Sequence, residues 1–409
     1  MKILAVCQYY RPEPFVIYKF LEQLATFGHE VHVVTGFPNY GYNRIMDGYD
    51  GSKEMDEIIE GVYVHRVPIY PRKNSKLSIC KNYLSFWKSA KKYVRKLDNS
   101  FDIVFTMTLS PVIAASAANW YAKKYHKPLL HYCVDLWPES LVTTGTIHSH
   151  SLAYRFFYHW SKKIYQRADK ILVSSPSFLN YFKEVLHLTK KDYGVLYQPA
   201  LIDESDDEEI YEEETINIVY CGNLGKLQCL PLIDEMLEKI KDNPKIRFHF
   251  IGMGSEKKHF LERVQKKGLE KMVVDHGPLP SKKAIRYFKN ADALYVALTG
   301  KGYVGHTIPN KLIFYLAFKK PILAMVKYDA RDVLLAANGS IIVEENADSL
   351  YEGVQTLLRL TKVEKEKMGK NNQDYFKTHF HLSILSRKLE EELYSLIKEA
   401  NSSATTDKE

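Results

Sequence analysis

Residues 1–36, MKILAVCQYYRPEPFVIYKFLEQLATFGHEVHVVTG, predict a strand, a helix and a second strand. The apolar run KILAVC is typical of a buried strand. Positions 17, 20, 21 and 24 are then apolar, which is the i, i+3, i+4, i+7 spacing of a helix packed on a sheet. Gly28 ends this helix, and EVHVVTG supplies the second strand. The chain therefore begins with a βαβ unit.

The same alternation of apolar strands and amphipathic helices continues along the chain. FDIVFTMT, PLLHYCVD and KILVSS are the next strands, and INIVYCG, IRFHFIG, MVVDHG, DALYVAL and PILAMV repeat the pattern after residue 214. Strands that are apolar throughout indicate parallel sheets covered by helices on both faces. The predicted class is therefore α/β, with two Rossmann-like, doubly wound parallel-sheet domains in tandem.

Domain boundaries follow from length and from changes in composition. A chain of 409 residues exceeds one ordinary core and favours two domains. The expected first domain covers residues 1–203, the acidic stretch 204–214 forms an exposed connector, and the second domain covers 215–380. A last helix is expected at 381–400, and a polar tail at 401–409.

Composition and charge restrict the class of protein. The chain has 45% hydrophobic and 26% charged residues, near the average of soluble globular proteins. The first apolar run is too short for a signal peptide, and no run approaches the roughly 20 residues that span a bilayer, so we expect a cytosolic protein. The net charge of +8 is uneven: residues 1–200 carry 26 Lys and Arg against 16 Asp and Glu, whereas the rest carry 31 against 33.

Two carboxylates follow a predicted strand of the first domain, in HYCVDLWPES. Asp135 ends the strand and Glu139 comes four residues later, at the edge where parallel sheets bind ligands. Such a pair can hold a sugar hydroxyl, accept a proton or stabilise a developing positive charge. Spacing alone gives equal weight to the alternative that Asp135 only caps the following turn.

Two further loops of the first domain reach the same edge. In QYYRPEPFV the prolines end the first strand, which places Glu13 in the expected cleft. TGFPNY ends the second strand, and its Phe37, Asn39 and Tyr40 offer aromatic rings and an amide to a sugar. The residues alone favour an ordinary Pro-Asn-Tyr turn for this segment.

Three loops of the second domain have features of a phosphate site. YCGNLGKLQ and IGMGSE each hold two glycines, which permit close backbone approach or serve turn geometry only. In GYVGHTIPNKL, Thr307 precedes Pro309 at a helix start, so free amides, the helix dipole and Lys311 can converge on a diphosphate. The alternative is a capped helix start with an exposed lysine. Because the three loops share one edge, the anion site is favoured.

Residues 72–97, RKNSKLSICKNYLSFWKSAKKYVRKL, contain nine Lys or Arg residues and no acid. Apolar and aromatic residues recur among them, which predicts a basic amphipathic helix. Such a helix can lie on an anionic membrane, or it can pack its apolar face into the domain and leave its lysines in water. The positive charge of the first half favours membrane contact, and no recognised module supports nucleic-acid binding.

Taken in order, the motifs resemble a known enzyme family. YYRPEPFVI, GHEVHVVTGFPNY, DLWPES, ADKILVSS, YCGNLGKLQ and TIPNKLIFYLAFKKP are similar to segments of glycosyltransferases of family 4, which have the GT-B fold of two Rossmann-like domains facing a cleft. The likeness runs from Lys2 to about residue 360. It is strongest to bacterial enzymes of capsule, exopolysaccharide and O-antigen assembly, including acetamido-fucosyl transferases.

The resemblance implies a retaining transfer of a hexose or N-acetylaminosugar from a nucleotide-sugar, expected to be UDP-linked. The implied acceptor is a saccharide on undecaprenyl diphosphate, and no metal or other cofactor is obligatory. The second domain would bind the donor, the first domain would bind the acceptor, and the last helix would cross back to the first domain. The protein would then act as a peripheral protein at the cytoplasmic face of the inner membrane.

The expected site residues form four groups. The catalytic candidates are Asp135 and Glu139. Donor binding is assigned to Gly222, Asn223, Gly225, Lys226, Gln228, Gly252, Gly254, His306, Thr307, Pro309, Asn310 and Lys311. Acceptor binding is assigned to Glu13, Phe15, Phe37, Asn39, Tyr40 and Trp137. Membrane contact is assigned to Lys81, Trp87, Lys88, Lys91, Lys92 and Arg95.

Two places depart from the family pattern. Phe15 and Val16 stand where many relatives have glycines, so the first loop is expected to shape the acceptor site with side chains. The two glutamates of the family's donor domain correspond to His306 and Phe314, and phenylalanine cannot accept a hydrogen bond from ribose. Two alternatives therefore stay open: an enzyme like UDP-N-acetylglucosamine 2-epimerase, and a catalytically degraded subunit that binds a sugar nucleotide or polysaccharide.

Overall fold

The computed structural model describes residues 1–409 except 74, 110, 144, 201, 203–210, 212–214, 244 and 407–409. The chain forms two compact units. Unit 1 comprises Met1–Tyr197 and Leu382–Glu409, and unit 2 comprises Gln198–His381. Of the expected acidic connector, only Tyr211 lies within the described residues.

Unit 1 is built on an eight-stranded sheet with the order β3-β4-β2-β1-β5-β6-β7-β8. β3 pairs antiparallel with β4, and the other described pairs are parallel. The strands are β1 (Lys2–Val6), β2 (Glu30–Gly36), β3 (Met55–Ile59), β4 (Val62–Val67), β5 (Ile103–Thr108), β6 (Leu129–Cys133), β7 (Lys170–Val173) and β8 (Asp192–Val195). Every residue of β5 and β6 is buried, as expected for strands covered on both faces.

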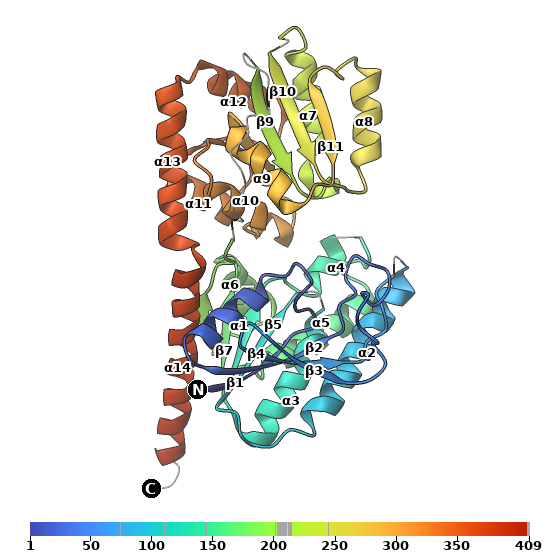
Figure 1. Ribbon diagram of the computed structural model, residues 1–409, viewed down its shortest axis with the longest axis vertical. Helices are drawn as coiled ribbons and strands as arrows, with labels where there is room; N and C mark the ends of the chain where they lie inside the picture. The colour runs from blue at the N-terminus through green and yellow to red at the C-terminus, as the bar shows by residue number, and fades with distance from the viewer. Residues whose placement is uncertain are drawn as a thin grey trace. The chain divides into compact units, whose positions relative to one another are not determined.

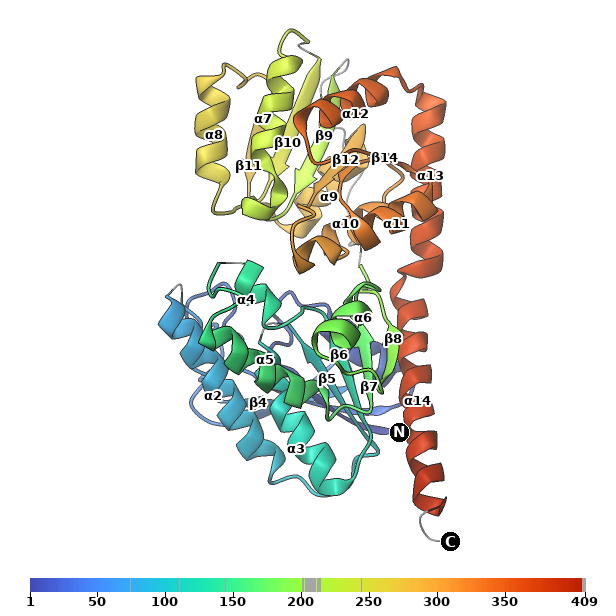
Figure 2. The ribbon, with the colours of Figure 1, turned by 180° about the vertical axis from the view of Figure 1, so that it is seen from behind.

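Helices cover both faces of this sheet (Figures 1 and 2). On one face, α1 (Ile17–Thr26) and the C-terminal α14 (Leu382–Thr406) share an apolar core with the sheet. On the other face, α2 (Lys76–Val94), α3 (Ser116–Tyr125), α5 (Leu152–Tyr165) and the 3-10 turn η1 (Val112–Ala115) lie together. The short elements are α4 (Glu139–Thr143), α6 (Phe178–Asn180) and the π-helical turn η2 (Tyr181–Val185). α14 continues to Thr406, beyond the end at residue 400 expected from the sequence.

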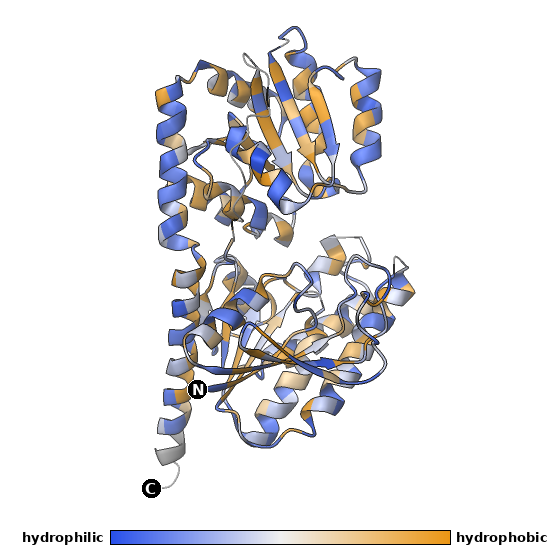
Figure 3. Cartoon of the chain, viewed as in Figure 1, coloured by the Kyte–Doolittle hydropathy of each residue, from blue (hydrophilic) through white to orange (hydrophobic). Residues whose placement is uncertain are grey.

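Unit 2 is built on a six-stranded parallel sheet with the order β11-β10-β9-β12-β13-β14. The strands are β9 (Ile216–Cys221), β10 (Ile246–Ile251), β11 (Val273–Gly277), β12 (Ala293–Ala297), β13 (Ile322–Met325) and β14 (Ser340–Ile342). The helices and 3-10 turns are η3 (Lys226–Gln228), α7 (Leu230–Lys239), α8 (Lys257–Lys266), α9 (Ser281–Asn290), η4 (Tyr303–His306), α10 (Asn310–Leu316), α11 (Tyr328–Ala337), α12 (Ala347–Arg359) and α13 (Lys362–His379). α13 is hydrophilic along most of its length, whereas β9 and β10 are largely hydrophobic (Figure 3).

Each sheet reverses its strand order at one place. In unit 1 the reversal lies between β1 and β5, and in unit 2 it lies between β9 and β12. Doubly wound sheets bind ligands at the carboxyl ends of the strands beside such a reversal. The described residues of the loops at these points are 7–16, Leu109 and Pro111 in unit 1, and 222–229 and 298–309 in unit 2. The predicted α/β class with two doubly wound parallel sheets is confirmed.

Within the described part of the chain, no helix is both long enough and apolar enough to cross a bilayer.

Candidate functional site

The two glycine loops of unit 2 touch each other through their backbones. Leu224 N donates a hydrogen bond to Met253 O at 2.8 Å. A Cβ on Gly252 would lie 2.0 Å from Gly222 O, and a Cβ on Gly254 would lie 2.2 Å from Leu224 O. The contact between the loops therefore requires glycine at 252 and 254, because any side chain would overlap the facing backbone. These glycines fix the backbone beside the strand reversal.

Gln228 holds the first glycine loop in shape. Its Oε1 accepts a hydrogen bond from Gly225 N at 3.0 Å, and its own N donates to Gly225 O at 3.3 Å. Gln228 is buried, whereas Asn223 and Lys226 are exposed. Gln228 thus stabilises the conformation of the loop, and Asn223 and Lys226 are the side chains that this loop presents to solvent.

Lys311 lies beside these loops, in the first turn of α10. Its Nζ donates a hydrogen bond to Tyr220 Oη and lies 4.1 Å from the centre of the Tyr220 ring. A Cβ on Gly222 would lie 3.0 Å from Nζ, so the ammonium group touches the first glycine loop. Burial lowers the pKa of Lys311 to about 8. No carboxylate among the described residues forms an ion pair with it. A desolvated cation without a carboxylate is an arrangement that a bound anion would complete.

The segment before α10 holds four further donor-site candidates. The His306 ring stacks on Tyr328 with 3.8 Å between ring centres. Its Nδ1 is buried and has no hydrogen-bond partner within the described ranges. Thr307 and Pro309 precede the helix, and Asn310 is its exposed first residue. α10 has only seven residues, so its dipole adds less than the sequence suggested.

Phe314, which the resemblance aligns with the second glutamate of the family's donor domain, lies in an aromatic cluster. Phe314 packs against Phe288 at 5.7 Å and against Phe318 at 5.2 Å between ring centres. The ring of Phe288 also contacts Tyr315 at 5.6 Å. Phe314 therefore packs among aromatic rings and offers no carboxylate to a ligand.

Glu345 lies at the same edge and was not among the residues expected from the sequence. Its Oε1 accepts from Thr299 Oγ1 at 2.6 Å, and its Oε2 accepts from Gly300 N at 2.8 Å. Burial by itself would raise the pKa of Glu345, but these hydrogen bonds outweigh burial and the pKa is lowered. Glu345 is therefore an ionised anchor for the loop after β12. It follows the short, half-buried strand β14, and the apolar run that marks this strand in the sequence, IIV, has only three residues.

In unit 1, Glu13 is buried beneath the loop that follows β2. Its Oε1 accepts hydrogen bonds from Asn39 N at 2.8 Å and from Tyr40 N at 2.7 Å. Burial raises the pKa of Glu13 to about 7, although these bonds and the charge of Arg66 oppose the shift. Glu13 is 1% exposed, so it joins two loops instead of presenting a carboxylate to solvent.

Asn39 and Phe37 are buried as well. Asn39 Nδ2 donates to Phe37 O at 2.8 Å, and Asn39 Oδ1 accepts from Arg72 N at 2.9 Å and from Asn82 Nδ2 at 3.0 Å. Asn82 in turn accepts a hydrogen bond from Gln8 Nε2 at 2.7 Å. The side-chain amide of Asn39, which the sequence analysis assigned to ligand binding, thus forms its hydrogen bonds within the loops of unit 1.

Three aromatic rings at this edge form an aromatic platform, defined as Tyr9, Phe15 and Tyr40. Phe15 stacks on Tyr9 at 4.7 Å with 19° between the ring planes. Tyr40 meets Tyr9 edge-on at 5.4 Å and Phe15 at 4.8 Å. Tyr9 is buried beneath the other two, which stay partly exposed. Exposed aromatic faces at a strand reversal suit the apolar faces of a sugar ring.

The predicted carboxylate pair has two different environments. Asp135 is partly exposed, and within the described residues its carboxylate forms no hydrogen bond or ion pair, while burial raises its pKa to about 6. Glu139 is buried and accepts a hydrogen bond from Tyr154 Oη at 2.6 Å. Trp137 is also buried, against the Phe157 ring at 4.8 Å. Asp135 is therefore the carboxylate that remains available to a ligand.

The predicted basic amphipathic helix forms α2. Phe86, Ala90 and Val94 point into unit 1 and are fully buried. Among the membrane-contact candidates, the exposed residues are Lys81, Lys88, Lys92 and Arg95, and the partly exposed residues are Trp87 and Lys91.

α5 lies beside α2 and was missed by the sequence analysis. The rings of Trp87 and Trp160 meet at 6.2 Å and join the two helices. Leu152 and Phe156 on α5 are 82% and 61% exposed, and Leu77 on α2 is 67% exposed. The sequence LAYRFFYHWSKKIY carried the signal, because it combines aromatic and basic residues without an acid.

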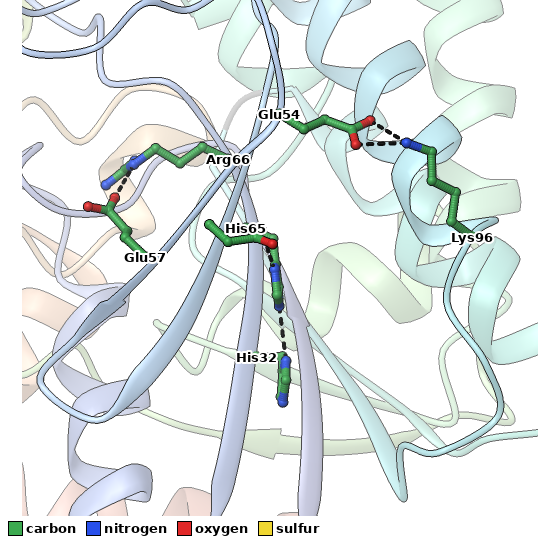
Figure 4. A network of polar contacts seen from close by, with 7 residues as sticks. His32, Glu54, Glu57, His65, Arg66 and Lys96 are labelled. Atoms are coloured by element: carbon green, nitrogen blue, oxygen red, sulfur yellow. Dashed lines mark hydrogen bonds and ion pairs between the residues drawn. The ribbon is translucent and has the colours of Figure 1, made fainter.

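Two cations of unit 1 have carboxylate partners, as Figure 4 shows. The Arg66 side chain is fully buried, pairs through Nε with Glu57 and donates from Nη1 to Gly36 O at 3.2 Å. Lys96 reaches both oxygens of Glu54 at 2.7 and 2.8 Å. Lys311 differs from these two cations, because no carboxylate among the described residues forms an ion pair with it.

Two family sequence models match the chain in succession. The model described as Glycosyltransferase Family 4 matches residues 15–199, and the model described as Glycosyl transferases group 1 matches residues 202–375. A protein from Pseudomonas aeruginosa, called probable glycosyltransferase WbjE, is 27% identical over an aligned length of 234 residues, and the match covers 50% of this chain. The match covers 54% of that relative, so the chain spans about half of its length.

Solved structures share the fold over nearly the whole chain. Sucrose-phosphate synthase from Thermosynechococcus elongatus has a TM-score of 0.74 at 14% identity, with 97% of this chain and 99% of that chain covered. HepE from Anabaena in complex with UDP has a TM-score of 0.67 at 12% identity, with 97% and 100% covered. The GT-B fold expected from the sequence is confirmed.

Proposed function

The chain belongs to the glycosyltransferases of family 4, and on this premise we propose that it moves a sugar from a UDP-sugar to a lipid-linked saccharide in the synthesis of a cell-surface polysaccharide. The proposed transfer retains the configuration at the anomeric carbon, and the proposed lipid carrier is undecaprenyl diphosphate. Unit 2 holds the donor and unit 1 holds the acceptor.

Lys311 is the single observation that carries the donor assignment. Its ammonium group is desolvated, touches a glycine loop and lacks a carboxylate partner among the described residues. A diphosphate would supply the missing negative charge. HepE, which shares the fold, is known in complexes with UDP and with UDP-glucose.

The chemistry follows from where charge develops. The bond between the anomeric carbon and the diphosphate oxygen breaks, and the acceptor hydroxyl forms a new bond to that carbon while its proton passes to a phosphate oxygen. Negative charge grows on the departing diphosphate, and Lys311 with the neighbouring loop amides stabilises it. Positive charge grows on the sugar. In unit 1, Asp135, ionised above about pH 6, orients the acceptor hydroxyl.

Contact with an anionic membrane is the second part of the proposal, and the helices of unit 1 support it. α2, α3 and α5 carry five, two and three Lys or Arg residues and no Asp or Glu. α14, on the opposite face, carries four Glu against three Lys or Arg. Exposed Leu77, Leu152 and Phe156 lie among the cations, as on helices that rest in a lipid headgroup layer.

The experiment that tests the donor assignment is calorimetric unfolding with UDP, GDP, CMP or NAD at saturation. A ligand that binds only the folded state raises its stability, so selective protection by UDP is expected. Transfer from UDP-sugars is then assayed, with the anomer of the product read by NMR. Asp135→Asn should lower turnover far more than UDP affinity, and unchanged turnover would remove Asp135 from the reaction. Protection by none of the four nucleotides would contradict the donor assignment.

A further inference from the structure

Arg72 lies at the edge of the aromatic platform, and only one of its three guanidinium nitrogens donates a hydrogen bond to a described residue. Nη1 donates to Tyr83 Oη and, at 3.3 Å, to Tyr9 Oη. The Nε and Nη2 atoms donate no hydrogen bond to any described residue, and the side chain is partly exposed. The backbone of Arg72 is fixed as well, because its N donates to Asn39 Oδ1 at 2.9 Å. A rigid, half-occupied guanidinium group therefore faces solvent.

Charge pairing distinguishes Arg72 from other arginines that are buried or half-buried in unit 1. Arg66 pairs with Glu57, and Arg11 pairs with Glu22. Within the described ranges Arg72 forms no ion pair, and its ionisable hydrogen-bond partners are the hydroxyls of Tyr9 and Tyr83. A planar guanidinium group that lacks a carboxylate and keeps two N–H directions free is suited to bind two oxygens of a phosphate at once.

The surroundings of Arg72 indicate which molecule carries this phosphate. Its Cζ lies 5.3 Å from the centre of the Tyr40 ring and 5.3 Å from that of Tyr83. Tyr40 belongs to the aromatic platform, so a sugar on the platform would have its phosphate substituent beside Arg72. On the other side, Arg72 precedes α2, whose lysines begin at Lys76. Arg72 thus lies between a surface for sugars and a surface for lipids.

We propose that Arg72 binds the diphosphate that joins the acceptor saccharide to its lipid. This assignment rests on the proposed function, and it adds the group by which unit 1 distinguishes a lipid-diphosphate acceptor from a free sugar. Tyr9 and Tyr83 are positioning residues, because they hold Nη1 and thereby direct Nε and Nη2 outwards. An anionic phospholipid headgroup offers the same chemistry, so the test separates the two sources.

Binding of decyl diphosphate gives the first test, with decanol as the uncharged control. All four tryptophans belong to unit 1, so their fluorescence reports on this unit, and saturating UDP fills the site of unit 2. Arg72→Met should weaken decyl diphosphate binding about 10- to 100-fold and leave decanol binding unchanged. Arg72→Lys keeps the charge but not the planar fork, and we expect a loss of about fivefold. Arg359→Met, which removes an exposed arginine of unit 2, is the matched control.

Transfer kinetics give the second test, in phospholipid-free detergent. The acceptor sugar that the wild type uses best is supplied as a decyl diphosphate or as a decyl glycoside. Arg72→Met should raise KM for the first acceptor about 10- to 100-fold, change KM for the second less than about twofold, and leave kcat similar. Equal effects on both acceptors would show that Arg72 only supports the loops, and would overturn the proposal.

Vesicles distinguish the lipid source. If Arg72→Met weakens binding to phosphatidylglycerol vesicles but leaves the two acceptors equally well used, Arg72 contacts phospholipid and the assignment to the acceptor is wrong. Failure of the proposed function has a different signature, since the wild type would then transfer to neither acceptor while the decyl diphosphate measurement still decides the role of Arg72.

Discussion

The loops at the carboxyl edges of the two sheets are held together in different ways. In unit 2 the glycine loops meet backbone to backbone, with Gly252 against Gly222. In unit 1 the loops are joined by buried side chains, with Glu13 bonded to the amides at 39 and 40 and Asn39 bonded to Asn82. A backbone contact leaves small loops beside a lysine, which suits a diphosphate. A side-chain contact leaves aromatic rings at the surface, which suits a sugar.

The largest expected effect comes from breaking the backbone contact of unit 2. Gly252 has φ +143, and an added Cβ would lie 2.0 Å from Gly222 O. We expect Gly252→Ala to lower the free energy of unfolding of unit 2 by about 3 to 4 kcal/mol. Gly268→Ala, at φ +68 with no atom within 4 Å of the added Cβ, should cost about 1 kcal/mol.

Hydrogen exchange followed by mass spectrometry measures the two glycine variants, because it resolves unit 2 from unit 1. Equal losses in both variants would mean that backbone conformation, and not the contact between the loops, makes glycine necessary at 252.

The next effect concerns the buried side chain that joins the loops of unit 1. Burial raises the pKa of Glu13 from 4.5 to about 7, so its contribution to stability is fully present below pH 4.5 and is lost as the pH rises through 7. Glu13→Gln keeps an oxygen for the two amides and carries no charge. Relative to the wild type, it should therefore gain roughly 3 kcal/mol between pH 4.5 and pH 8 in urea unfolding followed by tryptophan fluorescence.

Glu345→Gln in unit 2 is the control of opposite sign, and hydrogen exchange followed by mass spectrometry measures it, because all four tryptophans belong to unit 1. The pKa of Glu345 is lowered, so its contribution is present at neutral pH and is lost as the pH falls through its folded-state pKa. A pH-independent difference between the wild type and Glu13→Gln would show that Glu13 is not buried as an acid with a raised pKa.

Removal of the unpaired cation tests the anion site of unit 2. Lys311→Met should weaken UDP binding about 100-fold at pH 7, equivalent to about 2.7 kcal/mol. Because the pKa of Lys311 is lowered to about 8, UDP affinity of the wild type should fall as the pH rises above 8, whereas that of the variant should stay level. Lys226→Met, at an exposed position of the glycine loop, should lose less than about fivefold. Calorimetric titration measures all three proteins, and a wild-type affinity that is constant from pH 7 to pH 9 would exclude Lys311 as the anion ligand.

The smallest effect compares exposed leucines of the two units. Leu152 on α5 is 82% exposed among cations, and Leu335 on α11 of unit 2 is 59% exposed. Leu152→Ser should weaken co-sedimentation with phosphatidylglycerol vesicles about five- to tenfold, because an inserted leucine contributes about 1 to 1.4 kcal/mol. Leu335→Ser should have no effect. Equal behaviour of the two variants would remove α5 from the proposed membrane surface.

The sequence by itself determined the layered architecture and the loops that reach the carboxyl edges of the sheets. Strand and helix periodicity depend on neighbouring residues alone, so KILAVC, FDIVFTMT and INIVYCG were recognisable as buried strands. The loops that follow such strands must reach the carboxyl edge of a parallel sheet. For that reason Asp135, the glycine loops and Lys311 could be named before any contact was known.

Only the tertiary structure decided what each of these side chains does. Glu13 and Asn39 were expected to face a ligand, but the loops from β1 and β2 meet and bury both. Asp135 and Glu139 were both catalytic candidates, yet Tyr154 engages Glu139. In the sequence, Arg72 is one of nine cations in its segment. In the structure it is distinguished by its hydrogen bond to Tyr9, which lies 63 residues away along the chain. The physical reason is that desolvation and hydrogen bonding depend on neighbours in space, and these neighbours come from segments whose meeting no local pattern records.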